Sequence, residues 1–106
     1  FCYDGDTCYV IYEGKKDKVR LLDLDTPEIS NPKCEKEYIL AIEAREHINQ
    51  LISEGKKIEF ETEYNRDFFG RILSYIIIDG ENVSKLMVSH SLGVVYDKNN
   101  KKDWCE

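Results

Sequence analysis

One long amphipathic segment limits the folds that this chain can adopt. Between residues 35 and 53, apolar side chains recur every three or four positions, which is the spacing of a helix that buries one face. Gly55 is placed to end this helix. The predicted buried stripe consists of Tyr38, Ala41, Ala44, Ile48, Leu51 and Ile52.

Five shorter segments have the residue types and the boundaries of β-strands. Three precede the long helix and two follow it, at residues 1–3, 7–12, 19–23, 57–63 and 71–78. Turn and loop residues separate them at positions 4–6, 13–17, 31–33 and 79–80. After the last strand, Asn82 can cap a second, short helix that runs to about Ser91, with Gly93 past its end.

This order predicts a mainly β fold with helices, of the α+β class. An antiparallel sheet of five short strands must cover its edges or close on itself. The succession fits a five-stranded Greek-key barrel of the OB type, with the long helix between strands three and four and the short helix after strand five. The 106 residues are expected to form one domain, residues 1–106. The chain begins at Phe1 without a methionine or a leader pattern, so trimming at its ends stays open.

Composition excludes some classes of function. No apolar run approaches the ~20 residues that cross a bilayer, so no membrane partner is expected. The net charge of −6 argues against a protein that coats nucleic acid by phosphate neutralisation alone. The same charge is compatible with an enzyme that acts on nucleic acid, because a bound divalent cation reverses the local field.

Four cysteines leave two alternatives open. Cys2, Cys8, Cys34 and Cys105 lack the paired close spacing of a zinc site. Cys2 and Cys8 flank the first turn and can face each other across a hairpin, which leaves Cys34 and Cys105 as a second pair. Buried free thiols are an equally weighted alternative, because cysteine is often a small core residue.

Two short acidic strings carry the candidate chemistry. The first is Asp4-Gly5-Asp6-Thr7, and the second is Asp25-Thr26-Pro27-Glu28. Each has a local alternative: an ordinary hairpin turn for the first, and a helix start capped by Thr26 for the second. As a pair, Asp6 and Asp25 are hard oxygen ligands that suit calcium or magnesium. Asp4 would bind directly or orient Asp6, and Glu28 would serve as a base or position a water molecule beside the metal.

Two arginines complete this set. Arg20 precedes the second acidic string, and Arg71 follows the stretch Asp67-Phe68-Phe69-Gly70. Guanidinium groups bind phosphate oxygens in a bidentate manner and stay charged at any pH. Carboxylates for a cation together with arginines for an anion indicate metal-dependent chemistry on a phosphodiester.

Strand geometry makes this hypothesis testable. Along the third predicted strand, Arg20 and Asp25 have opposite parity, so a straight strand would direct them to opposite faces of the sheet. Both can line one site only if the chain bends between them. We therefore predict an irregularity at residues 23–25.

The ordered motifs resemble the staphylococcal nuclease (thermonuclease) family. The resemblance covers nearly the whole chain and rests on residues 4–7, 19–22 and 25–28, on Ala44-Arg45, on residues 67–71 and on Asp79-Gly80. It implies an OB-type barrel and a calcium-dependent nuclease that cleaves DNA and RNA, leaving 3′-phosphates. One Ca²⁺ would be held by Asp6, Asp25 and the backbone carbonyl of Thr26. Glu28 would serve the attacking water, and Arg20 and Arg71 would hold the phosphate.

The chain departs from the family pattern in three places. Phe69 stands where the family enzyme has a tyrosine, so one hydroxyl contact to the substrate is absent. Tyr96 alone represents the aromatic pair that packs on a base. The chain ends soon after Trp104, before the third helix of the family enzyme.

Several expectations follow from the resemblance and the residues together. DNA or RNA is the expected substrate, the protein is expected to be a monomer, and the family and the four cysteines favour a secreted or periplasmic location. The lysines Lys98, Lys101 and Lys102 are expected in a solvated, flexible tail that adds weak attraction for a nucleic-acid strand. A non-catalytic OB module that binds single strands or a protein partner is the alternative function.

Overall fold

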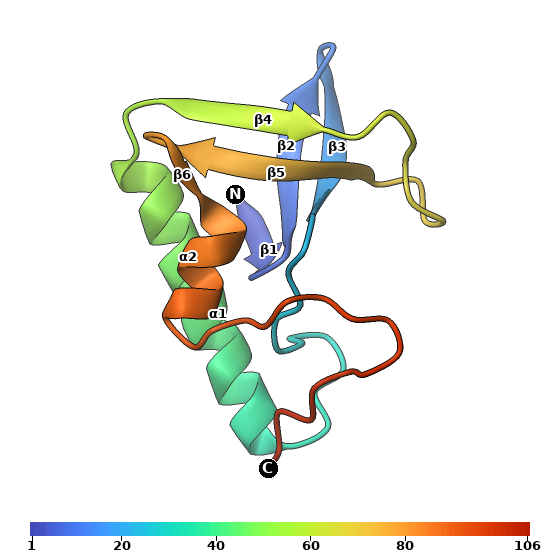
Figure 1. Cartoon of the computed structure of the whole chain (residues 1–106), viewed down its shortest axis with the longest axis vertical. Coiled ribbons are helices and arrows are strands. Elements are labelled where there is room, and N and C mark those ends of the chain that lie inside the picture. The colour runs from blue at the N-terminus through green and yellow to red at the C-terminus, as the bar shows by residue number, and fades with distance from the viewer.

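Six strands and two helices follow one another along the chain in the computed structural model, which describes residues 1–106 (Figure 1). Both helices lie beside the sheet. The loops before α1 and after α2 run together at the opposite side of the molecule from the β2–β3 hairpin tip. The elements are β1 (Cys2–Asp4), β2 (Thr7–Tyr12), β3 (Lys15–Leu21), α1 (Glu35–Glu54), β4 (Ile58–Thr62), β5 (Ile72–Ile78), β6 (Glu81–Asn82) and α2 (Val83–Ser89).

The sheet has the order β1-β2-β3-β5-β4, with β6 paired to β5. All neighbours are antiparallel except β3 and β5, which run parallel with Val19 opposite Ile72. The predicted α+β class is confirmed. The expected count of five strands is wrong, because the turn at Asp79 and Gly80 folds residues 81–82 back onto β5 as a sixth strand. The sheet is open rather than a closed barrel, because β4 pairs with β5 alone.

The β2–β3 hairpin is longer than the sequence predicts. Its two-residue turn, Glu13 and Gly14, has φ values of 51° and 78°, the pattern of a type I′ turn, and Tyr12 pairs directly with Lys15. The expected polar turn over residues 13–17 is therefore too long, and the third strand starts earlier than residue 19. Polar residues occupy the start of β3 because that part of the hairpin projects into solvent.

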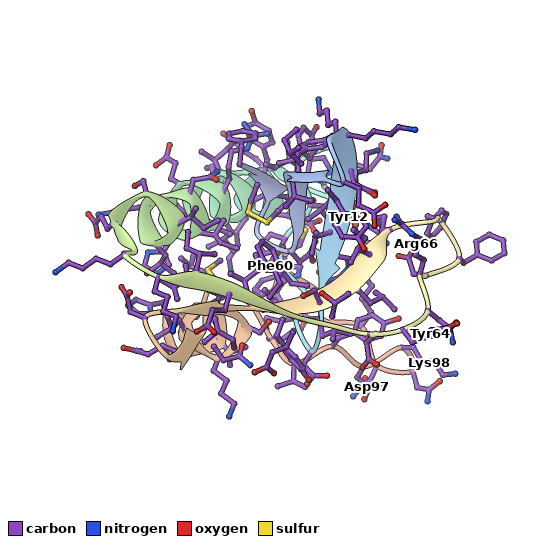
Figure 2. All side chains as sticks on the ribbon, turned by 90° about the horizontal axis from the view of Figure 1, so that it is seen from above. Tyr12, Phe60, Tyr64, Arg66, Asp97 and Lys98 are labelled. Atoms are coloured by element: carbon purple, nitrogen blue, oxygen red, sulfur yellow. A yellow bond between two sulfur atoms is a disulfide. The ribbon has the colours of Figure 1, made fainter.

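Apart from the pocket described in the next subsection, a second groove, which is mostly apolar, lies between β2 and β4. Its lining includes Tyr12, Phe60, Tyr64 and Arg66, which Figure 2 labels. All five residues of β4 are exposed, so this strand contributes little to the core. The groove contains none of the residues that the sequence proposes for chemistry.

The long helix α1 nearly matches its predicted span, and Gly55 ends it by donating its N–H to the Leu51 carbonyl (3.1 Å). Ala41, Ala44 and Ile48 are buried as predicted, but Tyr38 is 45% exposed and does not belong to the buried stripe. A charged residue, Glu37, is buried near that end instead, at 5% exposure.

The short helix α2 starts where the sequence predicts. The Asn82 side chain accepts a hydrogen bond from the Ser84 N–H (2.9 Å), so Asn82 is its cap, and the helix ends at Ser89, two residues before the predicted end. The Ser84 hydroxyl donates to the Leu22 carbonyl (2.7 Å). This bond ties α2 to the chain just beyond β3.

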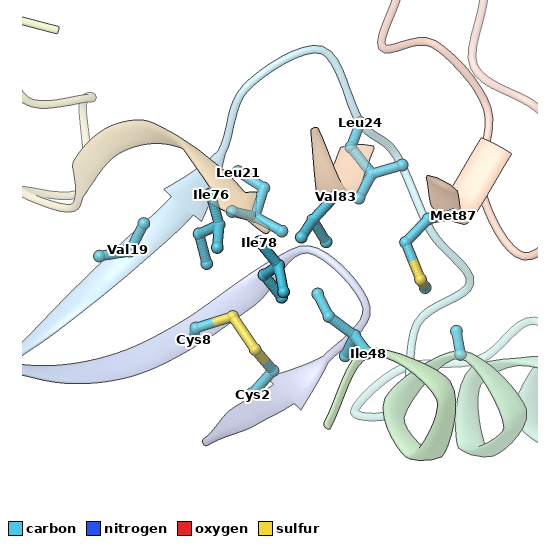
Figure 3. Close-up of a cluster of buried hydrophobic side chains, with 11 residues drawn as sticks. Cys2, Cys8, Val19, Leu21, Leu24, Ile48, Ile76, Ile78, Val83 and Met87 are labelled. Atoms are coloured by element: carbon cyan, nitrogen blue, oxygen red, sulfur yellow. A yellow bond between two sulfur atoms is a disulfide. The ribbon is translucent and has the colours of Figure 1, made fainter. Parts of the chain in front are cut away.

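One cluster of buried side chains joins the sheet to both helices (Figure 3). Val19 and Leu21 of β3 and Ile76 and Ile78 of β5 contribute from the sheet. Leu24, which follows β3 in a loop, is fully buried in the same cluster. The remaining members are Cys2, Cys8, Ala44, Ile48, Val83 and Met87. Leu24 therefore anchors the loop between Arg20 and Asp25 to the core.

Both proposed cysteine pairs are disulfides. Cys2–Cys8 joins β1 to β2, and Cys34–Cys105 joins the start of α1 to the end of the chain. No free cysteine remains, so the free-thiol alternative is wrong. Neither α1 nor α2 combines the length and the apolar character of a bilayer-crossing helix.

Candidate active site

One pocket gathers the predicted site residues from distant parts of the sequence. Its lining includes every one of them except Thr26: Asp4, Asp6, Arg20, Asp25, Glu28, Phe69, Arg71 and Tyr96. They come from the β1–β2 turn, the end of β3, the loop after it, the β4–β5 loop and the segment after α2. The two acidic strings and the two arginines therefore face one space.

The predicted bend after β3 is confirmed. The strand ends at Leu21, a turn follows at Leu22 and Asp23, and Asp23 has a φ of 58° in the left-handed region, which aspartate tolerates. Asp25 then forms an antiparallel bridge with Val94, donating its N–H to the Val94 carbonyl (2.8 Å) and accepting from the Val94 N–H (2.9 Å). The bend brings Asp25 into the pocket that Arg20 also lines.

Asp6 links the two acidic strings. One of its carboxylate oxygens, Oδ2, accepts a hydrogen bond from the Thr26 N–H (3.1 Å) and lies 3.5 Å from Arg20 Nη2. The other, Oδ1, accepts from the Thr7 hydroxyl (3.2 Å). The Asp6 backbone carbonyl accepts from the Leu21 N–H (2.8 Å), which holds the turn against the end of β3.

Arg20 stabilises the bend. Its Nη1 donates to the carbonyls of Leu21 (2.8 Å) and Leu24 (2.7 Å). Its guanidinium carbon lies 5.7 Å from the centre of the Tyr96 ring. Arg20 thus fixes the loop that carries Asp25, while Nη2 remains directed toward Asp6.

Arg71 is held by Asp67. The Asp67 carboxylate accepts from Arg71 Nε (2.8 Å), from the Arg71 N–H (2.8 Å) and from the Phe69 N–H (3.0 Å). Gly70, with a φ of 79°, makes the turn between them. Asp67 belongs to this motif in the sequence, but the sequence alone assigns it no role. Its opposite charge to Arg71, four residues away, is the signal that could have suggested this pairing.

The second acidic string is not a helix cap. Residues 27–34 are not helical, and Cys34 caps α1 by accepting from the Glu37 N–H at its sulfur (3.4 Å). The buried Glu37 carboxylate accepts from the N–H groups of Glu28 (3.1 Å) and Lys33 (2.8 Å), which fixes this loop. Thr26 is buried, and its hydroxyl has no hydrogen-bond partner.

Two glycines permit the close approach of these segments. A Cβ at Gly5 would lie 2.7 Å from Thr26 Cγ2, and a Cβ at Gly93 would lie 2.5 Å from Leu24 Cδ1 and 3.3 Å from the Asp25 carbonyl oxygen. Any side chain at either position would displace the loop that carries the second acidic string.

The carboxylates of the pocket disfavour one another's charge. Burial, and then the negative charge of Asp6, raise the pKa of Asp4 to about 7. The same two causes raise the pKa of Asp25, against the opposing influence of Lys101 and Arg20. The positive groups therefore leave part of the negative charge uncompensated.

This donor set fits a hard divalent cation that keeps several waters. No three His, Cys, Asp or Glu side chains are grouped as a metal cage. Two carboxylates with backbone oxygen and water are ligands of the kind that calcium and magnesium accept. A cation beside Asp6 and Asp25 would relieve the repulsion that raises the pKa values of Asp4 and Asp25.

The raised pKa of Asp4 predicts a pH dependence of stability in chelator. The folded protein binds a proton at Asp4 more tightly than the unfolded chain, so this stabilisation is complete below about pH 4 and is lost as the pH rises through about 7. Lowering the pH from about 7.5 to about 5.5 should raise the free energy of unfolding by about 2 kcal/mol in the wild type relative to Asp4→Asn. Urea unfolding of both proteins measures this difference. An identical pH dependence of unfolding in the two proteins would contradict a raised pKa of Asp4.

Some pocket residues could not be recognised from the sequence. Lys101 lines the pocket although the sequence places it in a solvated tail, and Asp23 lines it while accepting a hydrogen bond from the Tyr75 hydroxyl. Lys101 is brought back by the Asp25–Val94 bridge and the Cys34–Cys105 disulfide, contacts that no local pattern reveals.

The sequence of this chain is similar to those of known proteins. Residues 18–105 match the model of the family described as staphylococcal nuclease homologue. Endonuclease YncB of Bacillus subtilis is 40% identical over 103 residues, which cover 92% of this chain and 48% of YncB. The SPbeta prophage-derived endonuclease YokF of the same organism is 37% identical, over 92% of this chain and 34% of YokF. An uncharacterized endonuclease of Escherichia coli is 32% identical, over 92% of this chain and 58% of that protein.

These relatives are longer proteins. The chain spans about half of the length of YncB and about a third of YokF. The family match begins within β3 and runs to residue 105, so it includes Arg20, Asp25, Glu28, Arg71 and Tyr96. The chain belongs to the staphylococcal nuclease homologue family.

Proposed function

We propose that this domain is a calcium-dependent nuclease that hydrolyses phosphodiester bonds of DNA and RNA. The observation that carries the proposal is the convergence of Asp6, Asp25, Glu28, Arg20 and Arg71 on one pocket. The relatives named as endonucleases support the same class of reaction. The acidic net charge of −6 is consistent with an enzyme that acts through a cation rather than one that coats its substrate.

One Ca²⁺ would be held by the carboxylates of Asp6 and Asp25 and by the backbone carbonyl of Thr26. Calcium bound there polarises the scissile phosphate and offsets part of its charge. Asp4 would act through Asp6, because its carboxylate accepts from the Asp6 N–H (3.3 Å) and fixes the turn. The Thr26 N–H orients Asp6 Oδ2.

Glu28 would act on the attacking water. Its side chain is exposed to the pocket, and its backbone N–H is fixed by the buried Glu37 carboxylate (3.1 Å). A carboxylate in this place can accept a proton from water and direct the water oxygen toward phosphorus. The new bond would join that oxygen to phosphorus while the bond from phosphorus to the 5′ oxygen breaks. The 5′ oxygen would take a proton from solvent water, which leaves a 3′-phosphate and a 5′-hydroxyl.

Arg20 and Arg71 would stabilise the negative charge on the phosphate oxygens in the transition state. Asp67 engages Nε of Arg71, so Nη2 of that side chain remains free to donate. Backbone carbonyls engage Nη1 of Arg20, while Nη2 remains near the acidic turn. Both guanidinium groups are thus oriented before substrate binds, which is the arrangement that lowers a barrier most.

Phe69 and Tyr96 would contact the substrate with aromatic surface. Both side chains are exposed at the pocket, and each lies over an arginine, Phe69 over Arg71 (5.4 Å) and Tyr96 over Arg20 (5.7 Å). Stacking on a base is tolerant of sequence, so these residues would favour single strands without selecting one base.

The setting of the domain is also part of the proposal. Two disulfides are typical of proteins that work in oxidising compartments, which supports a secreted or periplasmic location. The domain is proposed to act as a monomer, with DNA or RNA as its only macromolecular partner.

Hydrolysis of single-stranded DNA and RNA with calcium, and then with excess chelator, tests this function. We expect cleavage with calcium, 3′-phosphate ends on the products, and no cleavage after chelation. Folded protein that binds single strands with or without calcium and cleaves none would support the non-catalytic OB module and contradict the nuclease.

A further inference from the structure

The segment after α2 returns to the pocket and is fixed at both of its ends. Its start is held by the paired hydrogen bonds between Val94 and Asp25, and its end by the Cys34–Cys105 disulfide. Trp104, beside that disulfide, is only 5% exposed. Between these anchors, Tyr96 and Lys101 line the pocket. The segment therefore lines the site rather than forming a free tail, and Figure 1 shows its path from α2 back to the C-terminus near the start of α1.

Lys101 differs from the other cations of this pocket. Arg20 is bonded to two carbonyls and lies near Asp6, and Arg71 is paired with Asp67. The Lys101 ammonium makes no hydrogen bond and no ion pair, and its side chain is exposed. The next residue, Lys102, lies over the Trp104 ring at 5.3 Å and does not line the pocket. Lys101 is thus the one pocket cation whose donors are all free.

Lys101 lines the pocket from the same segment as Tyr96, whereas Phe69 and Arg71 reach it from the β4–β5 loop. In a domain with a net charge of −6, a free ammonium at this place marks a local site for an anion.

We infer that Lys101 binds a second phosphate of the substrate, adjacent in the strand to the phosphate held by Arg20 and Arg71. This inference rests on the proposed phosphodiester substrate. A lysine ammonium suits such a contact, because it acts as a compact point charge with three donors and does not require one fixed geometry. The subsite makes the domain selective for chains with at least two phosphates.

Substrate length separates this role from a structural one. We expect Lys101→Ala to lower kcat/KM about tenfold on a trinucleotide with two phosphates, mainly through KM, since one charge-assisted contact is lost. On a dinucleotide with one phosphate, the same variant should stay within about twofold of the wild type, because no second phosphate is present. Lys101→Arg should restore most of the activity on the trinucleotide. Lys102→Ala is the matched control and should resemble the wild type on both substrates.

Two results would overturn the subsite. One is an equal loss on both substrates, which would mean that Lys101 acts on Asp25 or on the fold; the other is no loss on the trinucleotide. A wild type that cleaves neither of these substrates nor longer single strands would contradict the proposed function instead. In that case, fluorescence anisotropy at several salt concentrations can measure binding of the trinucleotide in chelator and test the phosphate contact of Lys101 separately. Weaker binding and a shallower salt dependence in Lys101→Ala support the subsite, and equal binding contradicts it.

Discussion

Asp25→Asn is expected to lower calcium-dependent hydrolysis on the order of 10³-fold and to weaken calcium binding to a similar degree. The change removes one of two carboxylates proposed as direct ligands. Its effect should therefore exceed the 10- to 100-fold loss that is typical when a residue hydrogen-bonded to a metal ligand is removed. The backbone bridge between Asp25 and Val94 uses no side-chain atom, so the fold should persist. Calorimetric titration with calcium and steady-state kinetics measure the two effects.

Asp23→Asn is the matched control for this change. Asp23 lines the same pocket but is exposed, and its carboxylate accepts a hydrogen bond from the Tyr75 hydroxyl. Its replacement also removes one negative charge, and it should leave activity within about threefold of the wild type, because exposed charges act weakly at a distance. Equal losses in the two variants would mean that the total charge of the pocket matters and that Asp25 is not a specific ligand.

Arg71→Ala is expected to lower kcat by about 10²–10³-fold, the usual cost of removing one preorganised donor to a developing negative charge. Arg71 is suited to this test because its hydrogen bonds lie within the β4–β5 loop and to Thr7, and the core does not depend on it. Arg71→Lys should recover little, because an ammonium cannot reproduce bidentate binding of phosphate. Kinetics on a single-stranded substrate measure both variants.

Arg66→Ala controls for the order of that loop. Arg66 forms a two-pronged ion pair with Asp17 (3.0 and 2.9 Å) and also donates to the Gly70 carbonyl (2.9 Å). It lines the second groove and not the active-site pocket (Figure 2). We expect its loss to leave kcat nearly unchanged. A loss as large as that of Arg71→Ala would assign the effect to loop order rather than to contact with phosphate.

Substitution of Arg20 would give a result that is harder to interpret. Its Nη1 closes the bend by binding the Leu21 and Leu24 carbonyls, so Arg20→Ala would displace Asp25 as well as remove a phosphate contact. The two arginines therefore contribute in different ways. Arg71 is held by a neighbouring carboxylate, whereas the Arg20 side chain stabilises the bend that carries Asp25, a proposed calcium ligand.

The parts of the site that follow from the sequence are those set by local geometry. The opposite parity of Arg20 and Asp25 is sufficient to predict a bend between them, and the positive φ of Asp23 provides it. The Asp4-Gly5-Asp6 string is both a turn and a pocket wall, so its two interpretations are compatible. The cap expected at Thr26 is wrong, because Cys34, eight residues later, supplies the cap of α1, and the loop between them is held by Glu37.

The parts that the sequence could not predict depend on contacts between distant segments. Cys34 and Cys105 are 71 residues apart, and although the sequence allows their pairing, it does not reveal that the segment before Cys105 brings Lys101 to the pocket. Glu37 shares the helical spacing of Ala41 and Ala44, but its charge alone suggests a solvated position. The loop N–H groups of Glu28 and Lys33 donate to its carboxylate and offset the cost of burial. The sixth strand is two residues long and carries no periodicity that could be detected.

Calcium titration of the wild type, measured by calorimetry and by hydrolysis of single-stranded DNA in the same buffer, would decide whether the pocket is a calcium-dependent nuclease site. We expect one bound ion, with hydrolysis that rises over the same calcium range as binding and disappears when chelator is added. Hydrolysis that persists in chelator, or calcium binding to folded protein without any hydrolysis, would show that it is not.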